Sequence, residues 1–508
     1  MSARSLLTPL HQLSATQIAH SVQSGELKAQ EVVDAHITQL EAVNPRLNAV
    51  VARRYEMARQ EALALDRRRA RGEALPALAG VPMSIKDALD VQGLPSTGGL
   101  TARAKHQAEQ DMSAVATLRA AGAIVLAKSN VAQALAYIES DNPLHGRCNH
   151  PEREDRSCGG SSGGEAAILA SGGSALGLGT DIGGSGRIPA AFCGVVGFKP
   201  TAGRLPDPQR LSLPLGCLAI QSQLAPMARR VDDAELLLKV LNPTHFALAD
   251  SRGVNLRGLR VGVYDHDGLF ACSPGIRRAV RQAADSLRAA GAKVQSFSIP
   301  DPGHVRHLFY ALLSGDGCAA LGRLLKGSRR DLRVLQLLLI GGRSAPTRSL
   351  LAGLVDALGQ RNLAAVLRAM GRRSVDAHWQ HCEQQADYRE GFLRGMDNAG
   401  VDLLLGPVAA TPALTHGAAK DMGVPGVYTT LYNLLGFPAG VVPVGRVQPS
   451  EESDRAASRD MAEQAARKVE AGSAGLPLAV QLAPRPWQEH QAFAAMRVIE
   501  AAAAHPDV

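Results

Sequence analysis

The sequence is poor in aromatic residues, which make up 4% of its 508 residues. Few aromatics leave little surface on which nucleic-acid bases could stack, so we expect no nucleic-acid partner even though the net charge is +8. There is also no uncharged apolar run of the ~18 residues that a spanning helix needs. The amino terminus lacks the apolar segment of a secretion signal, and we therefore predict a cytoplasmic protein.

Cysteine is scarce as well, with seven residues scattered between positions 148 and 382 and no Cys-x-x-Cys pair among them. An odd number at irregular spacing predicts neither a disulfide framework nor a zinc site. The phosphate-binding pattern Gly-x-x-x-x-Gly-Lys-Ser/Thr is missing too. We expect a globular protein of a reducing compartment that needs no metal and no cofactor.

Glycine and serine, by contrast, are concentrated between residues 159 and 200. Two loops in this stretch, Gly159–Gly164 and Gly179–Arg187, carry serine among glycines. Glycine allows positive φ and close approach of backbone N–H groups, so the second loop can form a nest of donors for an oxyanion. The donors of this nest would be Ile182, Gly183, Gly184 and Ser185. The segment Glu165–Leu176 between the loops is apolar and free of proline, which predicts a helix that sets one serine loop against the other.

Two simpler interpretations of the loops are less favoured. Glycine-rich loops are more often turns or linkers than active sites. A linker lacks apolar residues, however, whereas this chain continues into the apolar run Ile188–Phe198, which has to be buried. Phosphate binding is disfavoured because Asp181 would repel an anion. An oxyanion site is the interpretation that we favour.

The stretch Gly159–Thr201 resembles the amidase signature, the motif of serine hydrolases that use a Ser–Ser–Lys triad. Within that family the chain most resembles the fatty acid amide hydrolase branch, because the likeness extends far beyond the signature. It continues through Leu431–Asn433, Phe437–Val444, Gly475–Gln481 and Pro486–Glu489. The resemblance therefore spans most of the chain.

The resemblance assigns a catalytic triad. Lys86 alone would be interpreted as an ordinary solvated charge at the end of an apolar strand. Through Pro82 and Asp87 it corresponds to the lysine of the family's Pro-x-x-x-Lys-Asp segment. The signature serines correspond to Ser161 and Ser185.

Ser185 lies within the nest of donors, so we predict that it is the nucleophile and that Ser161 relays its proton to Lys86. The adjacent Ser162 is the less favoured relay and is expected to support the loop. Lys86 has to be neutral in this role, and burial beside nonacidic partners can lower a lysine pKa from ~10.4 toward ~7–8. The expected oxyanion hole is the set of backbone N–H groups of Ile182, Gly183, Gly184 and Ser185.

Other side chains are expected to support this site. Asp181 and Arg187 flank the nucleophile loop, and we predict that they form a buried ion pair that holds it. In the resemblance the segment Leu135–Asn142 approaches the catalytic loops, and the branch lines its acyl pocket there partly with aromatics. This chain has Leu135 and Ile138 at the matching places, so we expect these two residues in the substrate pocket.

The domain organisation follows from strand signals and from the resemblance. Strand-like segments at 259–264 and 293–297 bracket a helical segment at 276–290, a β-α-β rhythm that favours a parallel-rich sheet. The fold class is α/β, an amidase-signature fold with a large mixed, mostly parallel, twisted central sheet covered by helices on both faces. We expect a single domain over residues 1–508. Its parts are N-terminal helices at 1–75, a catalytic core at 76–205, a helical cap or lid at 310–395, and a C-terminal part at 396–508 that completes the sheet.

The stretch Leu332–Met370 repeats leucine at helical spacing, with arginines interleaved. Such helices ordinarily pack on the core or on another copy of the chain, and a homodimer is left open. Apolar faces bordered by positive charge are also typical of helices that lie in a bilayer interface. We predict that this segment covers the acyl channel and makes a weak peripheral contact with anionic membranes, at their inner face.

The function predicted from the sequence is a serine amidase acting on a small-molecule amide, with acyl or fatty acid amides as the expected substrates and esters or anilides as further ones. Two alternatives remain. One is the glutaminase subunit of a tRNA-dependent amidotransferase, which shares the triad, although the Leu332–Leu367 stretch and the C-terminal likeness argue against it. The other is a non-catalytic binding protein on an amidase scaffold, which the presence of all three triad residues disfavours.

Overall fold

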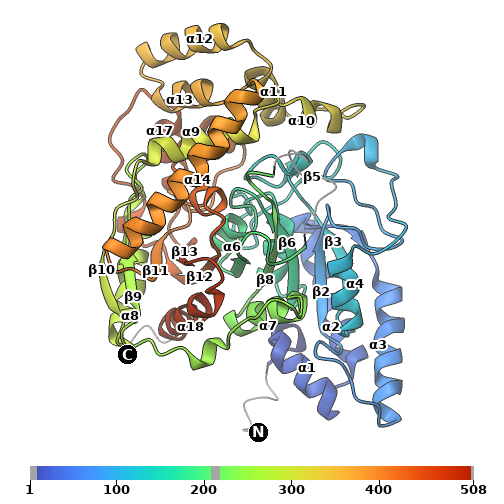
Figure 1. Ribbon diagram of the computed structural model, residues 1–508. Coiled ribbons are helices and arrows are strands. Elements are labelled where there is room, and N and C mark those ends of the chain that lie inside the picture. The colour runs from blue at the N-terminus through green and yellow to red at the C-terminus, as the bar shows by residue number, and fades with distance from the viewer. Residues whose placement is uncertain (1–7, 207–217, 505–508) are drawn as a thin grey trace.

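A single eleven-stranded sheet runs through the molecule in the computed structural model, which describes residues 8–206 and 218–504 (Figure 1). The order across the sheet is β1 (Val50–Arg53), β3 (Ile124–Ser129), β2 (Pro82–Lys86), β6 (Leu176–Asp181), β8 (Gln223–Ala228), β7 (Val196–Lys199), β12 (Ala439–Arg446), β13 (Pro477–Pro484), β11 (Leu403–Pro407), β9 (Arg260–Val263) and β10 (Lys293–Ser296). A separate two-stranded ribbon is made by β4 (Asp141–Asn142) and β5 (Gly146–Arg147). The expected mixed sheet of an α/β fold is confirmed.

Parallel pairing is confined to the two flanks of the sheet. Strands β3, β2 and β6 are parallel on one flank, and β11, β9 and β10 are parallel on the other. The strands between them, from β6 to β11, pair antiparallel, as do β1 and β3. The expectation of a mostly parallel sheet is therefore corrected. The β-α-β signal at 259–297 is real, but the central strands are joined by other connections that return antiparallel.

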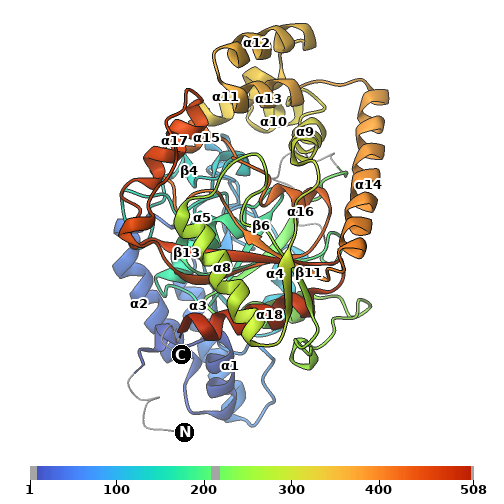
Figure 2. The same cartoon turned by 90° about the vertical axis from the view of Figure 1, so that its left-hand side faces the viewer.

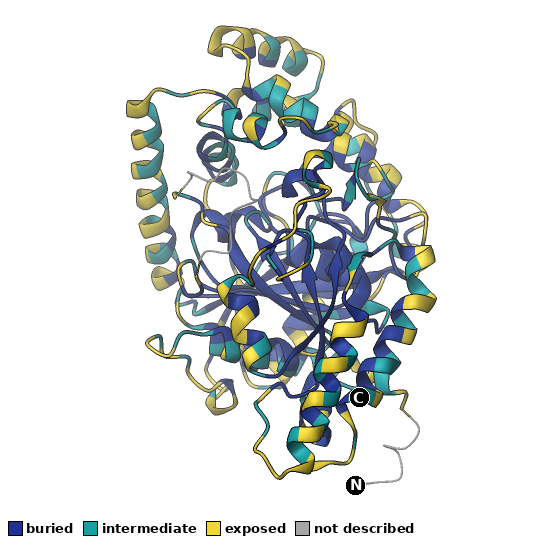
Figure 3. Cartoon of the chain, turned by 90° about the vertical axis from the view of Figure 1, so that its right-hand side faces the viewer, coloured by how far each residue is buried: buried dark blue, intermediate teal, exposed yellow. Residues whose placement is uncertain are grey.

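Helices cover both faces of the sheet, as predicted. On one face α5 (Gly163–Ala170) packs against α6 (Arg187–Cys193), and α6 lies on β13. On the other face α18 (Glu489–Ala504) contacts both α7 (Val231–Leu241) and α8 (Pro274–Ala289), and these cover β8, β12 and β13. The central strands are buried, whereas residues of the edge strands β1 and β10 are partly exposed. Most other exposed residues lie on the outer sides of the helices (Figure 3).

The predicted helix Glu165–Leu176 is shorter than expected. Helix α5 ends at Ala170, because Gly172 takes a left-handed conformation at φ 76° and the chain turns into β6 at Leu176. The small residues after Ala170 form the turn. The interpretation of a helix between the two serine loops is otherwise confirmed.

The N-terminal part is helical and packs around the β1 flank, at the lower right of Figure 1. Its helices are α1 (Ala15–Ser24), α2 (Ala29–Leu47) and α3 (Tyr55–Ala70). Helix α4 (Ser113–Ala120) comes later in the chain and leads into β3. Ser14 Oγ caps α1 by accepting a hydrogen bond from the backbone N–H of Gln17, and Gln17 Oε1 accepts one from the backbone N–H of Ser14. The described 3₁₀ turns are Leu10–Gln12, Thr101–Arg103, Gln133–Leu135, Ser251–Gly253 and Pro449–Glu451.

A layer of helices covers one end of the body, at the top of Figures 1 and 2. It consists of α9 (Pro302–Leu313), α10 (Ala319–Leu324), α11 (Leu332–Gly341), α12 (Ala345–Ala357) and α13 (Arg361–Ala369), with α15 (Ala419–Met422) and α17 (Met461–Glu470) beside them. Helix α14 (Val375–Asn398) leads from this layer back along the body (Figure 2), and α16 (Thr430–Leu434) lies below α9. We call α9–α13 the cap. The helical spacing in Leu332–Met370 is confirmed by α11, α12 and α13. None of the helices in the described residues has the length and apolar character needed to cross a membrane.

The register of two neighbouring strands positions the site. Strands β2 and β6 are parallel, with Met83 opposite Leu176 and Ile85 opposite Leu178. Their carboxyl ends therefore meet at one edge of the sheet, so that the last residue of β2, Lys86, lies close to the loop that follows Asp181. Clefts at the carboxyl ends of parallel strands are where α/β sheets bind ligands.

Candidate active site

Lys86 ends β2 in a fully buried position. Its Nζ donates to Ser161 Oγ at 2.7 Å and to Thr180 Oγ1 at 2.8 Å, and both acceptors are neutral. Burial lowers the pKa of Lys86 to about 7, although the carboxyl groups of Asp181 and Glu165 act in the opposite direction. A lysine with this pKa is neutral in a substantial fraction of molecules at neutral pH and can then accept a proton.

Ser161 lies in the first glycine loop, where the chain passes against Glu139. A Cβ on Gly160 would come within 2.6 Å of the backbone nitrogen of Glu139, so only glycine fits before the serine. The Gly160–Ser161 peptide bond is cis, and Ser161 is fully buried. The structure thus brings Ser161, one of the predicted triad residues, into direct contact with Lys86.

The adjacent Ser162 joins the two glycine loops. Its backbone N–H donates to the carbonyl oxygen of Ser185 at 3.1 Å, and its Oγ donates to the carbonyl oxygen of Thr180 at 3.3 Å. The hydroxyl of Ser162 is thus directed to the backbone of β6, while Ser161 faces Lys86. This arrangement fits the predicted supporting role of Ser162 better than a role in proton transfer.

Ser185 lies at the wall of the cavity that opens toward the cap, together with Ile182 and Gly183. It is 9% exposed, so its hydroxyl is nearly shielded from bulk water but not sealed off. Gly184 before it has φ 114°, and a Cβ there would come within 2.5 Å of Thr429 Oγ1. The tight loop that presents Ser185 therefore depends on glycine.

The predicted oxyanion nest needs one correction. The backbone N–H of Gly184 donates to Asp181 Oδ1 at 2.9 Å and is therefore committed to the carboxylate. Gly184 is also not part of the cavity wall, whereas Ile182, Gly183 and Ser185 are. The expected set of four donors is reduced to the N–H groups of these three residues, because the carboxylate that shapes the loop uses the fourth.

The ion pair between Asp181 and Arg187, expected from the sequence, is present and fully buried. Arg187 Nε lies 3.0 Å from Asp181 Oδ2. Burial acts to raise the pKa of Asp181, but the Arg187 guanidinium outweighs it and holds the pKa of that carboxyl well below its usual range. Two residues from the C-terminal half complete the network, since Arg187 also donates to Asn433 Oδ1 at 2.6 Å and to Gln481 Oε1 at 3.1 Å. This network ties the nucleophile loop to α16 and β13.

A cavity of about 550 Å³ extends from Ser185 into the cap. The predicted pocket residues Leu135 and Ile138 both line it. Sequence reasoning missed Phe309 and Tyr310 on α9, which lie close to the nucleophile loop; a Cβ on Gly183 would come within 3.0 Å of Phe309 Cζ. Farther out the wall is formed by apolar cap residues such as Leu337, Ile340, Leu351, Val366 and Leu367. Two adjacent aromatics in a chain with few of them are the signal that could have identified α9.

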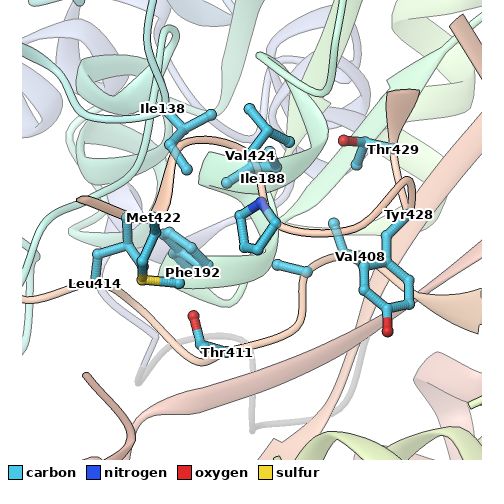
Figure 4. Close-up of a pocket in the computed structure, with 12 residues that line it drawn as sticks. Ile138, Ile188, Phe192, Val408, Thr411, Leu414, Met422, Val424, Tyr428 and Thr429 are labelled. Carbon is cyan, nitrogen blue, oxygen red and sulfur yellow. The ribbon is translucent and has the colours of Figure 1, made fainter. Parts of the chain in front are cut away.

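A second, much smaller pocket lies beside the nucleophile loop (Figure 4). Its volume is about 20 Å³, which is room for about one water molecule. Ile188, Thr429 and Ile138 are among its walls, and Ile138 belongs to the large cavity as well. This pocket is therefore too small for a long chain, whereas the large cavity extends toward the cap.

Glu165 is a further buried group near Lys86 that the sequence did not single out. It lies in the first turn of α5, and its Oε2 accepts a hydrogen bond from Ser84 Oγ at 2.5 Å, on the same strand as Lys86. Burial raises the pKa of Glu165 to about 7, so it titrates in the same range as Lys86. Within residues 8–206 and 218–504, no three His, Cys, Asp or Glu side chains are grouped so that they could hold a metal ion.

Comparison with known proteins gives one consistent result. The amidase family model matches residues 31–493. Fatty-acid amide hydrolase 1 of Sus scrofa is 34% identical over 506 residues, covering 96% of this chain and 85% of the relative. A glutamyl-tRNA(Gln) amidotransferase subunit from Roseiflexus castenholzii (strain DSM 13941 / HLO8) is 33% identical, covering 86% of this chain and 90% of the relative.

Solved structures agree with the sequence comparison. A fatty acid amide hydrolase superimposes with a TM-score of 0.84 at 25% identity, covering 99% of this chain and 87% of that one. The 6-aminohexanoate cyclic dimer hydrolase in complex with its substrate has a TM-score of 0.76 at 25% identity, covering 97% and 98%. The similarity therefore extends over the sheet, the serine loops and the cap together.

Proposed function

The chain belongs to the amidase family, and on this premise we propose that it is a serine amidase that forms an acyl-enzyme on Ser185, with Lys86 and Ser161 as its proton relay. The family acts on amide bonds, and this chain is accordingly an amide hydrolase. The observation that carries the finer proposal is the 2.7 Å hydrogen bond between Lys86 Nζ and Ser161 Oγ in a fully buried site.

The proposed reaction starts from neutral Lys86. Lys86 Nζ takes the proton of Ser161 while Ser161 takes the proton of Ser185, and Ser185 Oγ attacks the amide carbon. Negative charge then develops on the carbonyl oxygen. The N–H groups of Ile182, Gly183 and Ser185 stabilise this charge, and each donor of this kind is typically worth ~10²–10³ in rate.

The second half of the reaction uses the same groups in reverse. Protonated Lys86 returns its proton through Ser161 to the leaving nitrogen, the C–N bond breaks, and the acyl group remains on Ser185. Water, deprotonated through Ser161 and Lys86, attacks the ester and releases the acid. Esters can follow the same route, because they pass through a tetrahedral intermediate of the same kind.

The cavity supports amides with a long apolar chain as substrates. We expect kcat/KM to rise with acyl chain length from acetyl to dodecanoyl amides by about fourfold per methylene while the chain remains in the apolar wall, which corresponds to ~0.8 kcal/mol for each buried methylene. Steady-state hydrolysis across such a series measures this. A constant or falling kcat/KM would instead identify a hydrolase of small amides or anilides. The variant Leu337→Ser makes this wall more polar and should lower the slope of the series.

The glutaminase alternative keeps one observation in its favour, the 33% identity to the Roseiflexus amidotransferase subunit. The cavity is large and mostly apolar, whereas the side chain of glutamine is short and its amide is polar, so glutamine fits this cavity poorly. Glutaminase activity that appears only together with a copurifying partner would support this alternative. The third candidate, a binding protein without activity, is tested by fluorophosphonate labelling, which requires a nucleophilic serine.

The cap also supports our proposal of a weak contact with anionic membranes. Helix α12 and the residue that follows it carry an outward stripe of leucines at positions i, i+4 and i+8. Leu350 and Leu354 on the helix are 65% and 55% exposed, and the C-cap residue Leu358 is 69% exposed. The expected border of arginines is narrower than the sequence suggested. Arg333 and Arg348 are buried. Arg333 forms an ion pair with Asp331, and Arg348 donates to the carbonyl oxygen of Arg343. Of the arginines expected to form this border, Arg343, Arg361 and Arg368 are exposed, and Arg368 forms an ion pair with Asp356 at 2.6 Å.

We expect Leu350→Ser combined with Leu354→Ser to reduce flotation with anionic liposomes by about tenfold or more, because each leucine loses its apolar contact with the bilayer. Wild-type flotation should also weaken at high salt. Met57→Ser on α3, at an exposed position outside the cap, is the control and should float normally. No association at low or high salt, with unchanged long-chain turnover in the variant, would make the cap a packing element. If sedimentation shows that the wild type is a dimer and the variant a monomer, the leucine stripe contacts a second copy of the chain and not a membrane.

A further inference from the structure

The wall of the cavity is mostly apolar, and its charged members include Arg306, which lies one helical turn from the catalytic end. Asp316, Arg343, Lys420, Asp421 and Asp460 also line it. Arg306 and Phe309 are on α9 at positions i and i+3, which share a helix face, and both line the cavity. Phe309 is the residue whose ring covers Gly183 in the nucleophile loop. A substrate that reaches Ser185 along Phe309 therefore passes within reach of the Arg306 guanidinium.

Arg306 is poorly partnered for a half-buried cation. Its one hydrogen bond joins Nη1 to the neutral Asn362 Oδ1 at 3.0 Å, and among the described residues no carboxylate forms an ion pair with it. Two other cations near the cavity are neutralised by carboxylates, whereas Arg343 at its rim is exposed to solvent. Arg333 pairs with Asp331 at 2.6 Å and with Glu139 at 3.0 Å, and Lys420 lies 3.1 Å from Asp421. Burial accordingly lowers the pKa of Arg306, and the more distant Tyr310, Asp267 and Asp460 offset this only in part.

The two nearby carboxylates are already used by backbone groups. Asp460 accepts hydrogen bonds from the N–H groups of Asn362 and Ala462, each at 2.9 Å. Asp267 accepts from Leu269, Phe270 and Val427 at 2.9, 3.0 and 2.6 Å. Neither is free to turn toward Arg306. Burying a cation with unpaired N–H donors costs free energy unless a ligand anion or water accepts hydrogen bonds from them. A carboxylate suits a guanidinium well, because its two oxygens can accept two parallel N–H hydrogen bonds.

We propose that Arg306 binds a carboxylate carried by the amide substrate, so that the enzyme prefers amides with an anionic group beside the scissile bond over their neutral counterparts. This inference rests on the proposed function, because it assigns the substrate class of the same site. The apolar wall of the cap takes the hydrocarbon chain, and Arg306 takes the charge where α9 meets the nucleophile loop. Arg306 is thus a specificity-determining residue with no part in the proton relay.

The test compares kcat/KM for matched pairs of substrates. One series pairs N-dodecanoyl derivatives of glycine, β-alanine and γ-aminobutyrate with those of the corresponding amino alcohols. A second pairs the decylamide of glutarate with that of pentanoic acid, which places the carboxylate on the acyl side. Wild-type enzyme should prefer at least one acid over its neutral partner by about 10- to 100-fold, the range of a charged hydrogen bond. Arg306→Gln should remove that preference, and Arg306→Lys should retain part of it.

The preference ratio is insensitive to general damage, because loss of folded enzyme lowers both rates equally. Arg343→Gln is the control, since it removes an exposed cation at the rim of the same cavity and should leave the ratio unchanged. Equal ratios in wild type and Arg306→Gln would overturn the proposal, as would a wild-type preference for the neutral amides in every pair. Failure of the proposed function has a different signature: neither class is hydrolysed and fluorophosphonate does not label Ser185.

Discussion

Ser185→Ala is expected to abolish both amide turnover and fluorophosphonate labelling. The variant lacks the only protein atom in the proposal that bonds to the acyl carbon, so no acyl-enzyme can form, and loss of a nucleophile of this kind costs on the order of 10⁶ in kcat. Stability should hardly change, because the serine hydroxyl lies at the cavity wall and only its backbone carbonyl is bonded, to the N–H of Ser162. Labelling is measured by gel fluorescence and turnover by release of the free acid.

A matched serine separates this effect from loss of structure. Ser171→Ala removes a hydroxyl at the end of α5 that donates only to the carbonyl oxygen of Ile168 at 3.0 Å. This control should keep the wild-type rate and full labelling. Near-normal hydrolysis by Ser185→Ala would refute the assignment of the nucleophile, and labelling that persists in this variant would point to another serine.

Lys86→Met is expected to lower kcat by about 10³-fold or more, near the upper range for general acid–base catalysis. Methionine fills most of the buried volume of lysine and leaves no cavity, so the loss reports chemistry and not collapse of the core. Ser161→Ala should cost a similar factor. A relay acts as a unit, so the double variant should lose about as much kcat as either single variant. Independent effects would instead multiply. A fully active Lys86→Met would mean that another base exists.

The same assignment sets the pH dependence of turnover. Only neutral Lys86 can take a proton, and burial lowers its pKa to about 7, so kcat/KM should rise with pH and be near half of its maximum at about pH 7. At pH 5, about two units lower, only ~1% of the lysine is neutral. The rate should fall accordingly, and full activity at pH 5 would contradict the role of Lys86.

A second buried lysine provides the control for this profile. The pKa of Lys199 is also lowered to about 7 by burial, but its Nζ donates to the carbonyl oxygen of Pro200 and it lies at the end of β7. Lys199→Met should retain the rising profile, whereas Lys86→Met should lose it. Glu165 titrates in the same range, so Glu165→Gln is expected to move the midpoint to lower pH, because a negative charge that favours protonated Lys86 is removed.

Much of the candidate site was predictable from the sequence. The glycines of the two loops and the serines among them satisfy backbone requirements that are local, such as positive φ at Gly184 and close approach at Gly160. Family membership, confirmed by the match over residues 31–493, was carried by the same local motifs. The helices of Leu332–Met370 were predictable because helical periodicity is a short-range pattern.

Other properties depend on contacts between segments far apart in the chain. The direction of the central strands follows from how their connections pack, so the sheet is less parallel than a single β-α-β signal suggested. Gly184 donates to Asp181 because Arg187 and Asn433 also donate to that carboxylate and hold it in place. Gln481, on a third element, in turn accepts a hydrogen bond from Arg187.

By itself, then, the sequence determined the reactive groups and the family, because motifs record which backbone shapes and side chains the chemistry requires over a few neighbouring residues. Only the tertiary structure decided the state and surroundings of those groups. The pKa of Lys86 depends on its burial, and much of the cavity wall comes from the cap, more than 100 positions away from Ser185. The isolation of Arg306 among occupied carboxylates is likewise a property of packing, which no local pattern encodes.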